Sequence, residues 1–405
     1  MANNNENKIL NVPHLRFPEF SGEWKKCKLG DLCNVLMCKR ILVSQTNTED
    51  GVPFYKIGTI GSTPDAYISK ELFDDYKVKY NYPRKGEVMI TCAGTVGKCV
   101  VYDGEDAYFQ DSNIVWIDNP TQYISNGFLF HLLSKVDWRK LNSTTIIRIY
   151  NDDLRNLKMS YPRKEEQQKI SHLLSLLDER IATQNKIIEK LQSLIKGLVD
   201  SLLENPSWEK VYLRSFMQFY STNSLSWEQL SYSNGNVRNL HYGLIHGFQT
   251  SMIDSTLLPR ILPNYQPKQY TVCQDGDVAF ADASEDTNEI GKAIEFSNTI
   301  DVKTVCGLHT IHGRDIKQNT ILGFKGFAFN SRYFHDQVRR LAQGTKVYSI
   351  TAKNLSSCYV YIPDMIKQEN VVRLLNAYEE NLSLNRTLLN KYEIQKQYLL
   401  QQMLI

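Results

Sequence analysis

Two pairs of histidines are the residues whose spacing most invites a metal-binding interpretation. His309 and His312 are separated by two residues, and His241 and His246 by four. Imidazoles at such spacings bind zinc when cysteines or carboxylates complete the set of ligands. No cysteine or carboxylate pattern accompanies either pair. We therefore interpret these histidines as polar surface residues or as residues that face DNA, and we predict no metal site.

The sequence also lacks the common motifs of catalysis. Asn119-Pro120 is followed by Thr-Gln, whereas an adenine methyltransferase carries Asn-Pro-Pro-aromatic, so this segment is interpreted as a turn. The glycines before Lys98 have the wrong spacing for a phosphate-binding GxxxxGK loop. None of the eight histidines stands beside a nucleophile motif. We predict that the chain has no catalytic residue.

Composition is typical of a protein without a membrane span or a disulfide framework. The eight cysteines form no CxxC pair, and we expect reduced, mostly buried thiols. No apolar run approaches the length of a membrane span, and the Asn-rich residues 1–10 lack the apolar core of a signal peptide. We expect a cytoplasmic protein. A net charge of +3 argues neither for nor against nucleic acid, so any DNA surface must be a local patch.

The stretch 165–203 predicts one long helix that positions everything else. Apolar residues recur at alternating steps of three and four, which is the pattern of a coiled coil. The residues of this seam are Leu174, Leu177, Ile181, Gln184, Ile188, Leu191, Ile195, Leu198 and Leu202.

A copy of this helix lies 201 positions further on, where Pro363 matches Pro162 (363 − 162 = 201) and Gln368 matches Gln167. The copied seam consists of Leu375, Tyr378, Leu382, Asn385, Leu389, Tyr392, Lys396, Leu399 and Met403. Asn385 falls on Gln184, and a buried amide pair fixes the register of a coiled coil. The shared register indicates an internal duplication. A twofold-like repeat reverses one helix relative to the other, so we expect the two helices to pack antiparallel.

Each helix ends a similar half of the chain. Trp24-x-Lys26-x-x-Leu29 matches Trp208-x-Lys210-x-x-Leu213, and the glycine turns before Lys98 and Lys292 correspond. Short strand and turn patterns between them predict two α+β domains. The expected segments are an arm at 1–20, a domain at 21–162, a helix at 163–204, a second domain at 205–363 and a second helix at 364–405.

Three segments carry a resemblance to a known family. The arm LRFPEFSGEW, the helix opening EEQQKI and the segment NVRNLHYGLIH resemble the specificity subunit of type I restriction-modification systems. The resemblance covers essentially the whole chain, although the second helix opens with IKQENVV. It implies an α+β fold with two target-recognition domains, joined by two long antiparallel coiled-coil helices in an internal pseudo-twofold repeat. It also implies that each domain reads one half of a bipartite, asymmetric DNA site while the helices set the spacing.

The resemblance further implies the partners and cofactors. The expected partners are double-stranded DNA, two modification subunits that methylate adenine, and restriction subunits that translocate and cut; no membrane is expected. The subunit itself has no catalysis and no cofactor, and S-adenosylmethionine, ATP and Mg²⁺ are implied only for its partners. An alternative from another class is a non-DNA adaptor whose paired helices join partner proteins.

DNA readout needs side chains that reach phosphates and base edges. Arginine and lysine suit guanine and phosphate, and asparagine and glutamine suit adenine. The candidates are Lys39, Arg40, Lys56, Lys98, Gln110 and Arg148 in the first domain and Arg238, His241, Tyr242, His246, Lys292 and Lys346 in the second. An isolated surface lysine or arginine is more often merely solvated, so we expect about half of them to touch DNA.

Overall fold

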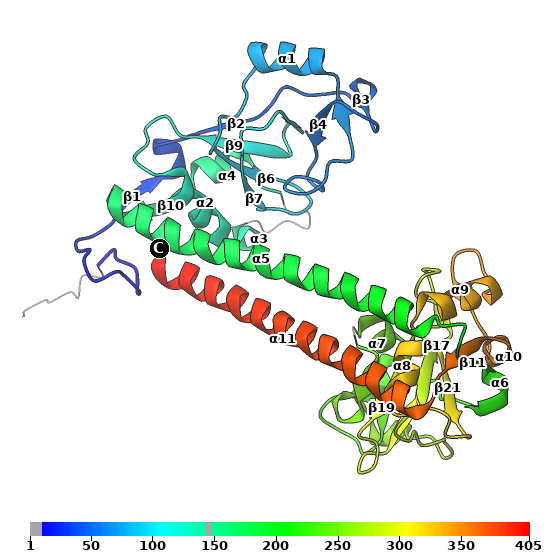
Figure 1. The fold of residues 1–405 in the computed structure, drawn as a ribbon. Coiled ribbons are helices and arrows are strands. Elements are labelled where there is room, and N and C mark those ends of the chain that lie inside the picture. Colours follow the sequence, from blue (N-terminus) through cyan, green and yellow to red (C-terminus); the bar gives the residue numbers. More distant parts are fainter. Residues whose placement is uncertain (1–9, 142–147, 249) are drawn as a thin grey trace, which may run out of the picture. The chain divides into compact units, whose positions relative to one another are not determined.

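The computed structural model describes residues 10–141, 148–248 and 250–405. Contacts divide the chain into two compact units, which are described separately. Unit 1 comprises Met1–Asn185 and Leu388–Ile405, and unit 2 comprises Lys186–Thr387. Two long helices, α5 (Lys164–Leu203, green in Figure 1) and α11 (Met365–Met403, red), contribute to both units. No helix among the described residues is long and apolar enough to cross a membrane.

The two long helices pack antiparallel within each unit, as the repeat predicted. In unit 1, Leu174 near the start of α5 shares a hydrophobic core with Met403 at the end of α11. In unit 2, Val199 and Leu203 at the end of α5 share a core with Leu375 near the start of α11. The apolar seam read from the sequence therefore becomes part of each unit's core.

Unit 1 combines small sheets with short helices. Its sheets have the strand orders β1-β10, β2-β9-β6-β7 and β3-β5-β4-β8. The strands are β1 Lys25–Lys28, β2 Asn34–Leu36, β3 Thr46–Asn47, β4 Val52–Tyr55, β5 Tyr67–Ile68, β6 Val88–Thr91, β7 Cys99–Val101, β8 Tyr108–Phe109, β9 Ile114–Asp118 and β10 Lys158–Tyr161. The shorter helices are α1 Lys70–Lys79, α2 Asn126–Lys135, α3 Trp138–Leu141 and α4 Asn151–Arg155.

Unit 2 has the same kind of architecture. Its sheets have the orders β11-β23, β12-β21-β17-β19-β15, β13-β16-β14-β20 and β18-β22. The strands are β11 Glu209–Tyr212, β12 Met217–Tyr220, β13 Leu230–Ser231, β14 Arg238–Leu240, β15 Met252–Asp254, β16 Arg260–Ile261, β17 Val278–Ala281, β18 Ala283–Ser284, β19 Ala293–Ser297, β20 Thr304–Cys306, β21 Thr310–Asp315, β22 Tyr348–Ser349 and β23 Tyr359–Ile362. The shorter helices are α6 Leu213–Phe216, α7 Tyr242–Gly247, α8 Phe324–Ala328, α9 Arg332–Leu341 and α10 Ala352–Ser356.

The internal repeat is visible in corresponding strand pairs. β1 pairs with β10 and β11 with β23, both antiparallel, each linking the first strand of a domain to the strand before its long helix. The Leu29 amide donates to the Leu157 carbonyl at 2.9 Å, and the Leu213 amide donates to the Cys358 carbonyl at 3.0 Å. In each unit, the first strand of the domain therefore pairs with its last strand, directly before the start of a long helix.

Candidate nucleic-acid interface

A turn at 110–113 collects several of the predicted DNA contacts of unit 1. The turn is tight because Ser112 has a left-handed backbone, with φ of 55°. Arg40 donates from Nε to Asp111 Oδ2 at 2.9 Å, and Arg148 donates from Nη2 to the Ser112 carbonyl at 3.1 Å. Gln110 accepts from the Ile57 amide at 3.4 Å. Three candidates from distant parts of the sequence therefore surround one turn.

Two other candidates of unit 1, Lys56 and Lys98, lie at the adjoining turn at 56–61, whereas Lys39 contacts Tyr80. Lys98 donates from Nζ to the Ile60 carbonyl at 2.5 Å, and Lys56 pairs with Asp65 at 2.9 Å. Lys39 lies over the ring of Tyr80, 5.4 Å from its centre. Exposed ion pairs contribute only about 0–1 kcal/mol. A phosphate could therefore replace the carboxylate partner of Lys56 at little cost.

A cavity of about 330 Å³ opens beside Arg148. Its lining includes Tyr150, which is 62% exposed, and the guanidinium-bearing Arg155. Arg148 also lies over the Tyr150 ring, 5.9 Å from its centre. Stacking surfaces of this kind suit nucleic-acid bases. Sequence analysis missed Tyr150 and Arg155, although the proximity of Tyr150 to Arg148 in the chain was an available signal.

In unit 2 the predicted residues gather around α7. The ring of His241 lies 4.6 Å from that of Trp227 and 4.7 Å from that of Tyr242, centre to centre. Tyr242 also contacts His309 edge to face at 5.2 Å. His241 is buried, and burial is the main reason why its pKa is lowered. This aromatic group includes Trp227 and His309, which sequence analysis did not select for DNA contact.

His246 and Lys292 meet at Glu289. His246 Nδ1 lies 3.4 Å from Glu289 Oε2, and Lys292 Nζ lies 3.1 Å from the same oxygen. The hydrogen bond from His246, with help from Lys292, lowers the pKa of Glu289 to about 2 despite partial burial. Lys292 also donates to the His246 carbonyl at 3.2 Å. Lys292 therefore holds α7 in place through its ion pair with Glu289 and its hydrogen bond to the His246 carbonyl.

Arg238 and Lys346 lie outside this group. Arg238 opens β14 and donates to the Leu258 carbonyl, and its pKa is lowered by burial and by the nearby charge of Arg260. Lys346 is exposed in the segment before β22. Neither makes a described contact with the residues of α7, and both stay predictions.

Lys98 and Lys292 occupy equivalent positions in the two units. Gly97, before Lys98, donates to the Thr91 carbonyl at 2.8 Å, and Gly291 donates to the Ala281 carbonyl at 2.9 Å. A Cβ at Gly97 would lie 2.2 Å from Trp138, so the turn requires glycine. Each lysine then caps a carbonyl of the neighbouring segment. The two segments that the lysines contact differ in their side chains. The segment of unit 1 carries Lys56, whereas that of unit 2 carries Tyr242 and His246.

The predicted helix-pairing residues lie in or beside the hydrophobic seam. Leu174, Leu177, Gln184, Ile188, Leu375 and Leu382 are buried, and Ile181, Leu191, Asn385, Leu389 and Leu399 are half-buried. Other apolar side chains of the helices face outward, among them Ile187, Leu194, Leu374 and Leu388, which are 38–44% exposed. The long helices therefore present apolar surface beyond their own seam.

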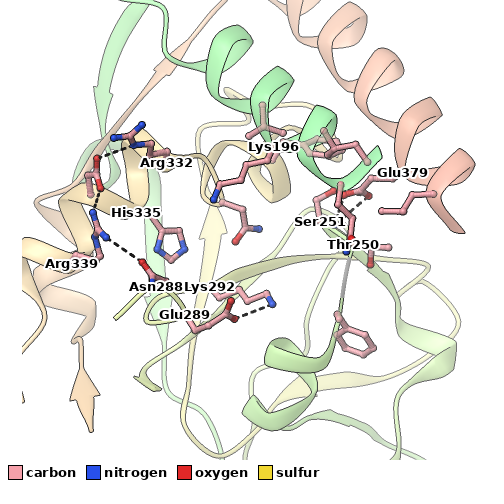
Figure 2. Close-up of a pocket in the computed structure, with 18 of the residues that line it drawn as sticks. Lys196, Thr250, Ser251, Asn288, Glu289, Lys292, Arg332, His335, Arg339 and Glu379 are labelled. Atoms are coloured by element: carbon pink, nitrogen blue, oxygen red, sulfur yellow. Dashed lines mark hydrogen bonds and ion pairs between the residues drawn. The ribbon is translucent and has the colours of Figure 1, made fainter. Parts of the chain in front are cut away.

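A larger cavity of about 520 Å³ lies within unit 2, where helix residues meet the domain. Figure 2 shows Lys196, Lys292, Arg332 and Arg339 around it, together with Glu379 facing Ser251. The Ser251 amide and hydroxyl donate to Glu379 at 3.0 and 3.1 Å. Burial raises the pKa of Glu379 to about 7, although the bonds from Ser251 act in the other direction. The cavity thus carries several basic residues, most of them paired with Glu289 or Asp336, and a titratable carboxyl at Glu379.

The chain resembles known proteins in both sequence and fold. Residues 21–193 match the type I restriction modification DNA specificity domain. A type I restriction enzyme specificity subunit from Haemophilus influenzae is 46% identical over 47% of this chain and 46% of its own length. The MjaX specificity subunit from Methanocaldococcus jannaschii is 21% identical over 93% of this chain and 91% of its own length. The chain is therefore similar to the specificity subunits of type I restriction enzymes.

The solved structures support the fold of a specificity subunit over the whole chain. The crystal structure of the S subunit from M. genitalium has a TM-score of 0.60 and 14% identity, and it covers 97% of this chain and 99% of the other. The likeness therefore extends beyond the matched domain to both units and both helices. In the Haemophilus relative, by contrast, the alignment spans about half the protein.

The interpretation of the histidines as surface residues needs correction at two positions. His241 is 3% exposed, so it is not a surface residue. His312 is 1% exposed and bonded to Asp277, so the surface interpretation is wrong for this residue. The sequence did not reveal its burial because β21 is buried on both faces over its first four residues, so the strand shows no alternating pattern. The eight cysteines are free thiols and six are buried, as predicted. None of the comparisons tests the DNA-contact residues, which stay predictions.

Proposed function

We propose that this chain is a specificity subunit that reads a bipartite, asymmetric DNA site, with one recognition domain on each half-site. The observation that carries the proposal is the equivalence of Lys98 and Lys292. Both lysines cap the neighbouring segment in a shared framework, but the capped segments present Lys56 in unit 1 and Tyr242 with His246 in unit 2. A common scaffold with different side chains suits two different half-sites.

We propose that the chain has no catalysis of its own and acts in the cytoplasm through partners. Two modification subunits would supply adenine methylation with S-adenosylmethionine, and restriction subunits would supply ATP- and Mg²⁺-dependent translocation and cleavage. Two similar halves offer two equivalent docking surfaces, which supports a pair of modification subunits. The exposed apolar residues of the long helices are our candidates for that docking.

A domain exchange tests the division of the site. Residues 208–363 would be replaced by the corresponding domain of another specificity subunit, and the methylated motif would be determined by methylome sequencing. We expect one half-site to change while the other half-site and the gap stay constant. A change in both half-sites would contradict the proposal.

An insertion tests the role of the helices. Four residues added after Gln184 lengthen a helix by about 6 Å, which corresponds to about two base pairs. We expect the gap between half-sites to grow by one or two base pairs, because the helices set the spacing of the domains. A change in the recognised bases with an unchanged gap would show that the helices do not set the spacing between the half-sites.

A further inference from the structure

Three potential metal ligands meet in the interior of unit 2. Cys273 precedes β17, Cys306 ends β20 and His312 lies in β21. The two sulfur atoms are 3.7 Å apart. Their Sγ atoms and a ring nitrogen of His312 all lie within 4.8 Å of one another, and all three residues are buried. Chain segments separated by up to 39 residues (312 − 273) thus bring two thiols and one imidazole together.

The sulfur separation fits a tetrahedral metal site. With Zn–S bonds of about 2.3 Å, two thiolates at the corners of a tetrahedron lie about 3.8 Å apart. A ring nitrogen of His312 lies within 4.8 Å of both sulfur atoms, near enough to supply the third ligand at a Zn–N bond of about 2.0 Å. Among the described residues no other histidine, cysteine or carboxylate joins the group. A water or another small donor would complete the fourth corner.

The surroundings of His312 favour metal binding. Its Nε2 lies 2.7 Å from Asp277 Oδ2, so this nitrogen carries the proton and Nδ1 keeps the free lone pair. A ligating histidine generally gives its second nitrogen to a carboxylate in this way. Arg314 holds the same carboxylate with two hydrogen bonds of 2.8 and 2.7 Å.

The polarity of the cluster argues against simple packing. Cys273 and Cys306 are both buried, and a cation that binds their sulfur atoms displaces the thiol protons. Two buried thiols alone could serve as small apolar groups. The third member of the cluster is a polar imidazole, and Asp277, itself held by Arg314, keeps it in one orientation beside these thiols.

We propose that Cys273, Cys306 and His312 bind one Zn²⁺ ion. Each thiol gives up its proton to water as its sulfur binds, and the neutral imidazole binds through Nδ1. The ion joins the segment before β17 to β20 and β21, beneath α7, because Ile245 of α7 shares a hydrophobic core with both cysteines. Its role is structural and does not depend on the identity of the DNA site. Sequence analysis missed the site because no CxxC pair marks it.

The test uses the full-length chain, reduced and freed of metal, and titrated with Co²⁺ alone and then Zn²⁺ alone. We expect one Co²⁺ per chain with a thiolate-to-cobalt charge-transfer band, displacement by Zn²⁺, and release of about two protons per ion. The band should be lost in Cys273→Ser and Cys306→Ser. It should persist in Cys358→Ser, which alters a buried thiol in another core of the same unit. No uptake by the reduced chain, or equal uptake in all three variants, would overturn the proposal.

A second measurement needs no variant and so is independent of folding defects. Thiol alkylation of the unmodified chain would be followed by peptide mass spectrometry with and without Zn²⁺. We expect Zn²⁺ to slow the alkylation of Cys273 and Cys306 at least tenfold, with Cys358 unchanged. Equal rates for all three cysteines, or a Cys273–Cys306 disulfide whose reduction restores no metal uptake, would contradict the site.

Discussion

Gln167 and Gln368 make the same three hydrogen bonds in the two halves of the chain. Each amide nitrogen donates to the carbonyl of the proline five residues earlier at 3.0 Å and to a loop carbonyl at 2.9 Å. Each amide oxygen accepts a backbone N–H, from Ser125 at 2.7 Å and from Ile321 at 3.0 Å. Both glutamines are fully buried. One amide therefore joins the start of each long helix to its domain, in both copies of the repeat.

Replacing Gln167 by alanine should destabilise the protein by about 2–4 kcal/mol. The substitution leaves the Ser125 amide and two backbone carbonyls without their partner in a buried place, and each unmet group is costly. Urea unfolding followed by circular dichroism would measure the loss. Gln168→Ala is the matched control, since Gln168 is the exposed neighbour in the same helix, and it should change stability by less than about 0.5 kcal/mol. Equal effects of the two substitutions would exclude the junction role of Gln167.

Arg148→Ala should weaken DNA binding by about 1–3 kcal/mol, since its guanidinium borders the 110–113 turn and the cavity beside Tyr150. Fluorescence anisotropy with the assembled methyltransferase complex and its methylated motif would measure the affinity. Lys140→Ala serves as control, because Lys140 is 84% exposed and pairs only with nearby Asp137 among the described ion pairs. A loss of similar size in both variants would remove Arg148 from the interface.

Glu379 should make stability depend on pH near neutrality. Its pKa is raised to about 7 by burial, so its contribution to stability is fully present below about 4.5 and is lost as pH rises through 7. Glu379→Gln should therefore be more stable than the natural chain at pH 8, by about 1–3 kcal/mol, and similar to it at pH 4.5. Unfolding curves at the two pH values give the comparison. A constant difference at both values would refute the titration of Glu379.

The outward-facing helix residues should matter for assembly rather than folding. Ile187→Asp combined with Leu194→Asp should reduce the number of modification subunits that copurify with the chain, because a charge replaces apolar contact area. Native mass spectrometry of the co-expressed complex would count the subunits. Val78→Asp in α1, at a position that is 87% exposed, is the control and should leave the count at two. An unchanged count in the double variant would place docking elsewhere.

The sequence predicted the features that depend on periodicity. The alignment of Gln167 with Gln368 is confirmed by their matching junctions, and the predicted seam residues are buried or half-buried. The pairing of strands in the sheets could not be predicted from the sequence, because most strands have only two to five residues.

Contacts between residues far apart in the sequence could not be predicted either. Arg16 of the arm binds Glu166 of the helix opening with two bonds of 2.7 Å, and Trp24 donates to the same carboxylate. Two of the three segments that carried the family resemblance thus touch each other, but nothing in their spacing indicates it. The 110–113 turn and the cysteine pair were missed for the same reason, since each is assembled from segments that only the fold brings together.

The way α11 returns to unit 1 affects the order in which the protein can be completed during translation. The core around Leu174 includes Met403 and Leu404, and the Gln402 carbonyl accepts the amide of Leu15 in the arm. The ribosome makes residues 388–405 only after the 202 residues of Lys186–Thr387 (387 − 186 + 1), which takes about 10–40 s. When that interval ends, unit 2 has its whole chain, while unit 1 still lacks the residues of α11 that complete its core. The part of the protein that is synthesised first is therefore the last to be finished.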